Sequence, residues 1–147
     1  MNFEGSVTIN ASRDKVWQFL TNPEGVSQCV PGLESVEVIA PNEKFLAIAS
    51  LGLGTVRVKF KIEVEWVELD APNRASLKAK GTAPGNSMEA TSQMELSNGT
   101  NGETVLQWAA DVKIMGNLAS MASRLMGGLT KKLTAAFFEC VQKKIET

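Results

Sequence analysis

The sequence contains no histidine and only two cysteines among its 147 residues. Without histidine the chain cannot form a Ser-His-Asp or Cys-His catalytic site, and it lacks the commonest metal-ligating side chain. Cys29 and Cys140 lie far apart and form neither a CxxC motif nor a zinc-binding pattern. We therefore expect no metal and no cofactor. We also expect both thiols to be reduced, with Cys29 a buried structural thiol.

Tyrosine is also absent, aromatic residues make up 6% of the chain, and 15 basic residues balance 16 acidic ones. This composition supplies neither the positive field nor the stacking surfaces that nucleic-acid binding requires. No apolar run approaches the roughly 20 residues that span a bilayer. The first residues, Met1–Gly5, lack the charged and apolar regions of a signal peptide. The sequence therefore predicts a cytoplasmic protein that has no nucleic-acid partner.

The length is that of one domain, which would comprise residues 1–147. Alternating apolar residues predict a first strand over residues 2–10. Ser12 is a candidate N-cap for a short helix that ends at Asn22-Pro23, and residues 23–30 predict further helical turns. The chain is thus expected to begin with a strand and a pair of small helices.

Beyond these helices the apolar period changes to two, which is typical of strands with one dry and one solvated face. The pattern predicts strands over residues 34–40, 43–53, 56–66, 75–80, 87–97 and 106–114. A turn at Asp70–Asn73 would place Glu65 opposite Lys78 and Glu63 opposite Lys80. Because charged residues then meet charged residues, we expect this register and exposed ion pairs.

From Asn117, a candidate N-cap, the period returns to 3.6 and predicts a helix of about thirty residues with one broad apolar stripe. Gly127-Gly128 lies in the middle of this helix, where each glycine costs about 1 kcal/mol relative to alanine. Two explanations remain open. The glycines allow the helix to pack closely on the sheet, or they leave room for a ligand beside it.

The economical arrangement of these elements is an antiparallel sheet that curves around the terminal helix. We therefore predict an α+β fold with a curved seven-stranded antiparallel sheet, a long C-terminal helix and two short helices after the first strand. The inward faces mix very small residues with large ones, so they would fill the gap between sheet and helix poorly and leave a pocket. The residues expected to line this pocket are Trp66, Leu77, Met88, Met94, Trp108, Met121, Leu125, Gly128 and Leu129.

A non-catalytic binding protein is the function that these residues favour. The alternative is an enzyme of the same fold, such as a cyclase or hydratase, which would need ionisable groups inside the pocket. The few candidates are Asp111, Glu34 and Arg124. We expect all three to be structural or rim residues, with Arg124 paired to a carboxylate near the start of the long helix. A third alternative is a module that only docks onto another protein.

Short motifs along nearly the whole chain support a more specific interpretation. They are Phe3-Glu4-Gly5, Val16-Trp17, Asn22-Pro23-Glu24, Cys29-Val30-Pro31-Gly32-Leu33-Glu34, Gly52-Leu53-Gly54, Ala110-Asp111-Val112, Gly116-Asn117-Leu118-Ala119, Ser123-Arg124-Leu125-Met126 and Phe137-Phe138. In these motifs the sequence resembles the carbon monoxide dehydrogenase G-subunit family. The stretch from Cys29 to Glu34 and the start of the last helix are the most specific parts.

The resemblance implies a START-like (SRPBCC) helix-grip fold that encloses a hydrophobic cavity. It also implies a carrier of a hydrophobic small molecule, a quinone or lipid, that is accessory to a molybdenum-containing CO dehydrogenase-like oxidoreductase. Longer family members end in a membrane-binding tail, so transient contact with a membrane surface is a further expectation. Trp108 stands where the family pattern suggests tyrosine, which removes a hydroxyl group from the expected pocket.

Overall fold

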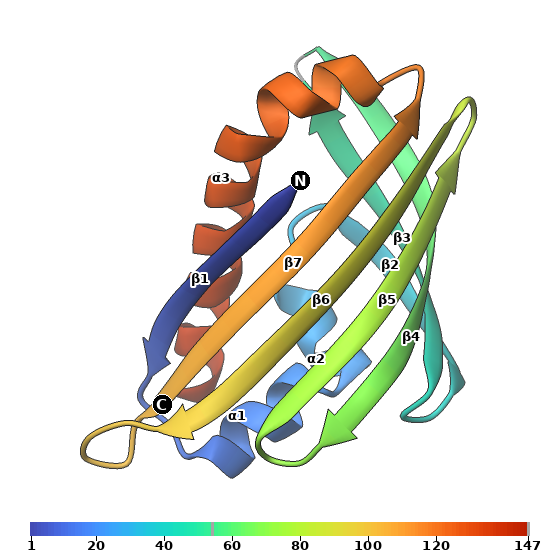
Figure 1. Ribbon diagram of the computed structural model, residues 1–147. Helices are drawn as coiled ribbons and strands as arrows, with labels where there is room; N and C mark the ends of the chain where they lie inside the picture. Colours follow the sequence, from blue (N-terminus) through green and yellow to red (C-terminus); the bar gives the residue numbers. More distant parts are fainter. Residues whose placement is uncertain (54, 147) are drawn as a thin grey trace.

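Seven strands form one antiparallel sheet, and the α-helices lie on one side of it (Figure 1). The computed structural model describes residues 1–53 and 55–146, so Gly54 of the Gly52-Leu53-Gly54 motif and Thr147 lie outside the described residues. The elements are β1 Asn2–Ile9, α1 Arg13–Leu20, α2 Pro23–Val26, the 3₁₀ turn η1 Ser27–Cys29, β2 Leu33–Ala40, β3 Lys44–Leu53, β4 Val56–Asp70, β5 Arg74–Ala83, β6 Asn86–Asn98, β7 Thr104–Gly116 and α3 Ala119–Ile145.

The strands follow the order β1-β7-β6-β5-β4-β3-β2, so the first strand of the chain pairs with the last. The sheet curves, and α3 passes over its end and then runs beside β1 (Figure 1). This arrangement confirms the predicted α+β fold with two short helices after the first strand. None of the described helices combines the length and the apolar character that a membrane span requires.

The predicted hairpin register between β4 and β5 is confirmed. Glu65 is paired with Lys78, and Glu63 with Lys80. The expected ion pairs were wrong, however, because no ion pair among the described residues joins Glu65 to Lys78 or Glu63 to Lys80, and Glu63 pairs with Lys44 on β3 instead. Their hydrogen bond raises the pKa of Lys44 and lowers the pKa of Glu63. Both groups are exposed, so this pair belongs to the solvated face of the sheet.

The two N-cap predictions had different outcomes. Ser12 caps α1 as expected, and its Oγ accepts a hydrogen bond of 3.3 Å from the backbone N–H of Lys15. The prediction that Asn117 caps α3 was wrong, because that helix begins one residue later and Leu118 occupies its N-cap position. No side chain caps the first turn of α3, but the β5–β6 hairpin holds its start, since Oδ1 of Asn86 accepts the backbone N–H of Leu118 at 2.9 Å.

The expectation of reduced thiols was wrong. Cys29 and Cys140 form a disulfide that joins η1 to α3 across 111 residues of sequence, so neither cysteine is free. Sequence spacing could not reveal this bond, because only the packing of α3 brings the two positions together. The expectation of a cytoplasmic location rests partly on reduced cysteines. Since disulfides persist mainly in oxidising surroundings, that reason no longer holds.

The buried core is divided into two clusters. The larger one joins α1, the ends of β1, β6 and β7, and the C-terminal half of α3. Its buried members are Ile9, Val16, Leu20, Cys29, Leu96, Leu106, Val141 and Ile145. The smaller cluster joins the far end of β7 to the first turns of α3 through Ile114, Ala122 and Met126. The helix is therefore fixed to the sheet near both of its ends.

The start of α3 provides a first test. Replacing Asn86 with alanine should lower the free energy of unfolding by about 0.5–1.5 kcal/mol, because the Leu118 N–H loses its acceptor. The matched control is Asn117→Ala, which should cost less, since the Asn117 side chain does not cap the helix. Urea denaturation of both variants measures the difference. A larger loss in Asn117→Ala would mean that the sequence-based cap is the correct one.

Candidate functional site

A cavity of about 340 Å³ lies between the concave face of the sheet, the C-terminal half of α3 and the segment that follows η1. Its size is at the lower end of the range of ligand pockets, about 300–1,000 Å³. The lining residues are Leu20, Val30, Pro31, Trp66, Ala75, Ser76, Leu77, Ser92, Gln93, Met94, Leu106, Trp108, Leu133, Thr134, Phe137 and Phe138. Most of these side chains are apolar, so the cavity suits a hydrophobic molecule.

Adjacent strands contribute the floor of the cavity through paired positions. Ala75 is paired with Met94, and Met94 with Trp108. The next row is formed by Leu77 and Ser92, whose Oγ donates a 3.3 Å hydrogen bond to the carbonyl oxygen of Ala109. Ala75 and Ser92 have small side chains, which leave space above the sheet at these positions. The space above them forms the cavity.

Trp108 lies over a glycine of the edge strand. Gly5 is its partner on β1, and a Cβ atom placed there would lie 2.8 Å from Nε1 of Trp108. The glycine of the Phe3-Glu4-Gly5 motif therefore provides the room that the indole ring needs. Trp108 is half-buried and forms part of the cavity wall.

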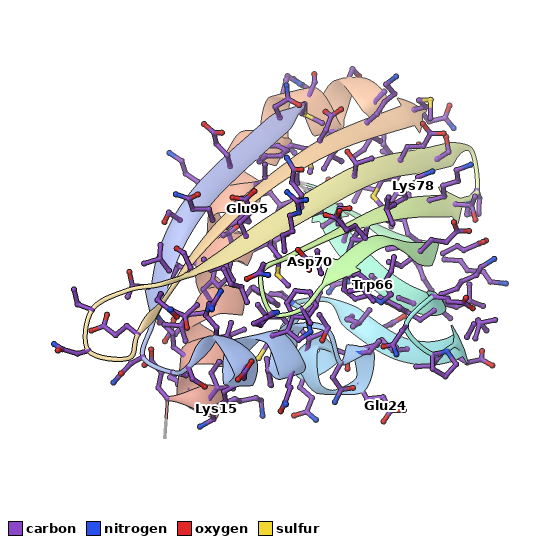
Figure 2. The ribbon with its side chains drawn as sticks, turned by 60° about the horizontal axis from the view of Figure 1, so that its bottom comes forward. Lys15, Glu24, Trp66, Asp70, Lys78 and Glu95 are labelled. Atoms are coloured by element: carbon purple, nitrogen blue, oxygen red, sulfur yellow. A yellow bond between two sulfur atoms is a disulfide. The ribbon has the colours of Figure 1, made fainter. Side chains whose placement is uncertain are left out.

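Trp66 extends from β4 on the side of the sheet that faces α1 and α2 (Figure 2). Its ring centroid lies 6.5 Å from that of Phe45. It borders both the main cavity and a second hollow of about 460 Å³ that also contacts Trp17, Phe45 and Lys44. Trp66 thus separates the apolar cavity from a more polar hollow at the surface.

The residues expected to line the pocket are found in three different places. Trp66, Leu77, Met94 and Trp108 line the cavity. The next group, Met88, Met121 and Leu129, packs against the smaller core cluster instead. Leu125 is 39% exposed and Gly128 is exposed, and neither lines the cavity.

Sequence reasoning missed the part of the wall that lies toward the C-terminal end of α3. There the lining is formed by Leu133, Thr134, Phe137 and Phe138, and across from them by Val30 and Pro31. A signal for both groups is present in the sequence, since the Phe137-Phe138 pair and the Cys29–Glu34 stretch are among the family motifs. Periodicity alone identified the correct face of the helix, but not the turn that borders the cavity.

Ionisable groups lie outside this cavity. None of the described lining residues carries an ionisable side chain. Asp111 is paired with the N-terminal ammonium at 3.4 Å, and Glu34 with Lys59 at 3.2 Å. Arg124 is exposed and forms no ion pair among the described residues, so its predicted pairing was wrong. Within residues 1–53 and 55–146, no group of three or more His, Cys, Asp or Glu residues could hold a metal.

The family model of the carbon monoxide dehydrogenase G subunit, CoxG, matches residues 5–146. The chain belongs to this family. The matched range therefore includes the cavity walls on the sheet, on α3 and on the segment after η1. No curated protein matches the chain.

Solved structures share the fold of this CoxG family member. A conserved protein from Geobacillus kaustophilus superimposes with a TM-score of 0.89 at 26% identity, and the alignment covers 98% of this chain and 94% of that one. The Zhui aromatase/cyclase from Streptomyces sp. R1128 has a TM-score of 0.67 at 16% identity, with coverage of 97% and 94%. The second similarity is one of fold alone.

The glycine pair of α3 has open space around it. Gly127 and Gly128 are exposed, and a Cβ atom added to either would meet no atom within 4 Å. The explanation that they allow close packing on the sheet was therefore wrong. Since neither glycine lines the cavity, the idea that they leave room for a ligand gains no support from their position.

Alanine at either position should stabilise the protein. We expect Gly127→Ala and Gly128→Ala each to raise the free energy of unfolding by up to about 1 kcal/mol, because helix propensity improves without a clash. The contrasting control is Gly32→Ala, which should be destabilising, because Gly32 has a φ of +82° and an added Cβ would collide with the carbonyl oxygen of Ser50. Thermal melts measure all three changes. Loss of stability at either helix position would contradict the open environment.

Proposed function

We propose that this protein binds a hydrophobic small molecule of the quinone or lipid class in the cavity between the sheet and α3. The observation that supports this proposal is the apolar cavity of about 340 Å³ bordered by Trp66, Met94 and Trp108. Each methylene group transferred from water into such a site contributes about 0.8 kcal/mol. Because few polar groups line the cavity, binding would depend mainly on this apolar transfer.

The partner that we propose is a molybdenum-containing oxidoreductase of the CO dehydrogenase type, to which the protein is accessory. This part rests on membership of the CoxG family. A quinone or lipid partitions into membranes, so transient contact with a membrane surface belongs to the same proposal. The protein would then carry the molecule in its cavity between that surface and the enzyme.

A binding role is favoured over a catalytic one by the placement of the ionisable groups. The cyclase that shares the fold makes an enzyme the natural alternative. General acid or base catalysis needs a titratable group within hydrogen-bonding reach of the reacting atoms. Here Asp111 is 63% exposed and bound to the N-terminus, and Glu34 is held by Lys59. Neither carboxylate lines the cavity.

Filling part of the cavity should weaken binding. Thr134 lines the cavity, whereas the next residue on α3, Ala135, is exposed and does not. We expect Thr134→Phe to weaken the binding of a short-chain isoprenoid quinone by about tenfold or more, which corresponds to about 1.4 kcal/mol. The matched control Ala135→Phe should bind normally. Quenching of tryptophan fluorescence reports binding, because Trp66 and Trp108 border the site.

Circular dichroism and a thermal melt establish that each of these variants is folded. Equal affinity in Thr134→Phe and Ala135→Phe would show that the ligand does not occupy this cavity. A protein that only docks onto an oxidoreductase would show no quenching in any variant. It would still bind the enzyme after Thr134→Phe, so the absence of quenching is the result that separates that function from a carrier.

The length of the ligand provides an independent test. In a series of n-alkyl carboxylic acids, affinity should rise about fourfold for each added methylene group that enters the cavity. The increase should stop once the cavity is full, because later methylene groups remain in water. Calorimetric titration of the series measures both the slope and the plateau. Affinity that is independent of chain length would contradict an apolar site.

A further inference from the structure

We propose that the ligand enters beside Val30 and Pro31 and that the Cys29–Cys140 disulfide holds this entrance closed. Reduction of the disulfide would then open the entrance and accelerate ligand exchange. This inference concerns the regulation of the proposed binding site and so rests on the proposed function. It begins with the position of the disulfide relative to the cavity wall.

The disulfide joins two walls of the cavity at their common edge. On one side, Cys29 is directly followed by Val30 and Pro31, both of which line the cavity. On the other side, Cys140 lies less than one helical turn beyond Phe137 and Phe138, which also line it. The covalent bond therefore fixes the separation between the segment after η1 and α3.

The cavity reaches solvent at this edge. Val30 is 38% exposed and Pro31 is also exposed, although both contribute to the lining. Cys29 itself is only 4% exposed. The segment thus runs from a buried anchor at the disulfide to an exposed rim within two residues. Displacement of this rim would widen the opening without disturbing the sheet.

Apart from the disulfide, the hydrogen bonds of residues 29–32 do not connect them to α3. The backbone N–H of Val30 donates to Ser27 and that of Leu33 donates to Val30, both at 3.3 Å, so these bonds are local. Gly32 accepts a 2.8 Å hydrogen bond from Ser50 of β3. Among the described residues, no hydrogen bond or ion pair joins residues 29–32 to α3.

The positive φ of Gly32, +82°, provides a natural pivot at the end of the segment. With Gly32 held by β3 and Cys29 released, the residues between them could move away from Phe137 and Phe138. Apart from apolar contacts, only the weak 3.8 Å contact between Sγ of Cys140 and the carbonyl oxygen of Gln28 would then oppose opening. The disulfide is therefore the contact that keeps the entrance narrow.

The chemistry of the switch is thiol–disulfide exchange with a dithiol. Two electrons and two protons pass to the Cys29–Cys140 disulfide, which becomes two thiols, while the dithiol is oxidised to its own disulfide. A protein or small-molecule dithiol could act in this way. The oxidised form would retain its ligand, and the reduced form would exchange it.

The test compares ligand release from the oxidised and reduced protein. The probe is cis-parinaric acid, whose release into excess phosphatidylcholine vesicles is followed by stopped-flow fluorescence. We expect dithiothreitol to increase the dissociation rate by about tenfold in the native sequence. The double variant Cys29→Ser/Cys140→Ser should release the probe at the fast rate, and dithiothreitol should not change that rate. Equal rates for the oxidised and reduced protein would overturn the proposal.

Two further measurements make the outcome unambiguous. Circular dichroism determines whether the reduced protein and the double variant remain folded, and global unfolding on reduction would overturn a role in gating. Hydrogen exchange of the Val30 and Leu33 amides should accelerate on reduction, while amides in the centre of β6 should stay protected. If cis-parinaric acid binds in neither state, the proposed function fails. The exchange of these two amides then still decides whether the disulfide controls the segment.

Discussion

A single long helix has to cover the concave face of a sheet of seven strands. An α-helix with its side chains is only about 10–12 Å wide, whereas neighbouring strands lie about 4.8 Å apart, so one helix cannot contact all seven strands. Its apolar stripe meets the sheet in two places, at the cluster around Leu106 and Val141 and at the cluster around Ile114 and Met126. The cavity is a consequence of this mismatch in width.

Side-chain size on the concave face determines where the unfilled space lies. Large residues such as Leu106 and Ile114 reach the helix and become buried at 2% and 9% exposure. Between them the rows of the sheet contain Ser92 and Ala110, whose side chains are too short to do so. Trp108 leans over Gly5 and does not project straight toward the helix. The cavity therefore lies above small residues such as Ser92, beside the larger cluster, and reaches solvent at Val30 and Pro31.

The segment from α1 to β2 completes the cavity on the side that the helix leaves open. Leu20, Val30 and Pro31 from this segment contribute to the lining. The segment is joined to the sheet by the hydrogen bond between Gly32 and Ser50, and to the helix by the disulfide between Cys29 and Cys140. This short segment thus connects the helix layer to the sheet.

Local pattern in the sequence determined the strands, the helices, the hairpin register and the inward face of the strands from β4 to β7, whereas both faces of β3 carry apolar residues and its inward face was left open. Charged residues alternate with apolar ones along β4 and β5, and a shift by one residue would bury Glu65 and Lys78, so that shift is excluded. The family motifs also indicated the fold. The sequence also supplied Trp66, Leu77, Met94 and Trp108 as wall residues, because inward parity on a strand is a local property.

Only the tertiary structure decided which turn of α3 borders the cavity, which residue caps that helix and which partner each cysteine has. These properties depend on how far α3 is displaced along the sheet, and a repeating apolar stripe permits several displacements. Met121 and Leu129 therefore pack into the core, while Thr134 and Phe137 line the cavity. The same displacement brings Cys140 to Cys29, across 111 residues that carry no sequence signal for their contact.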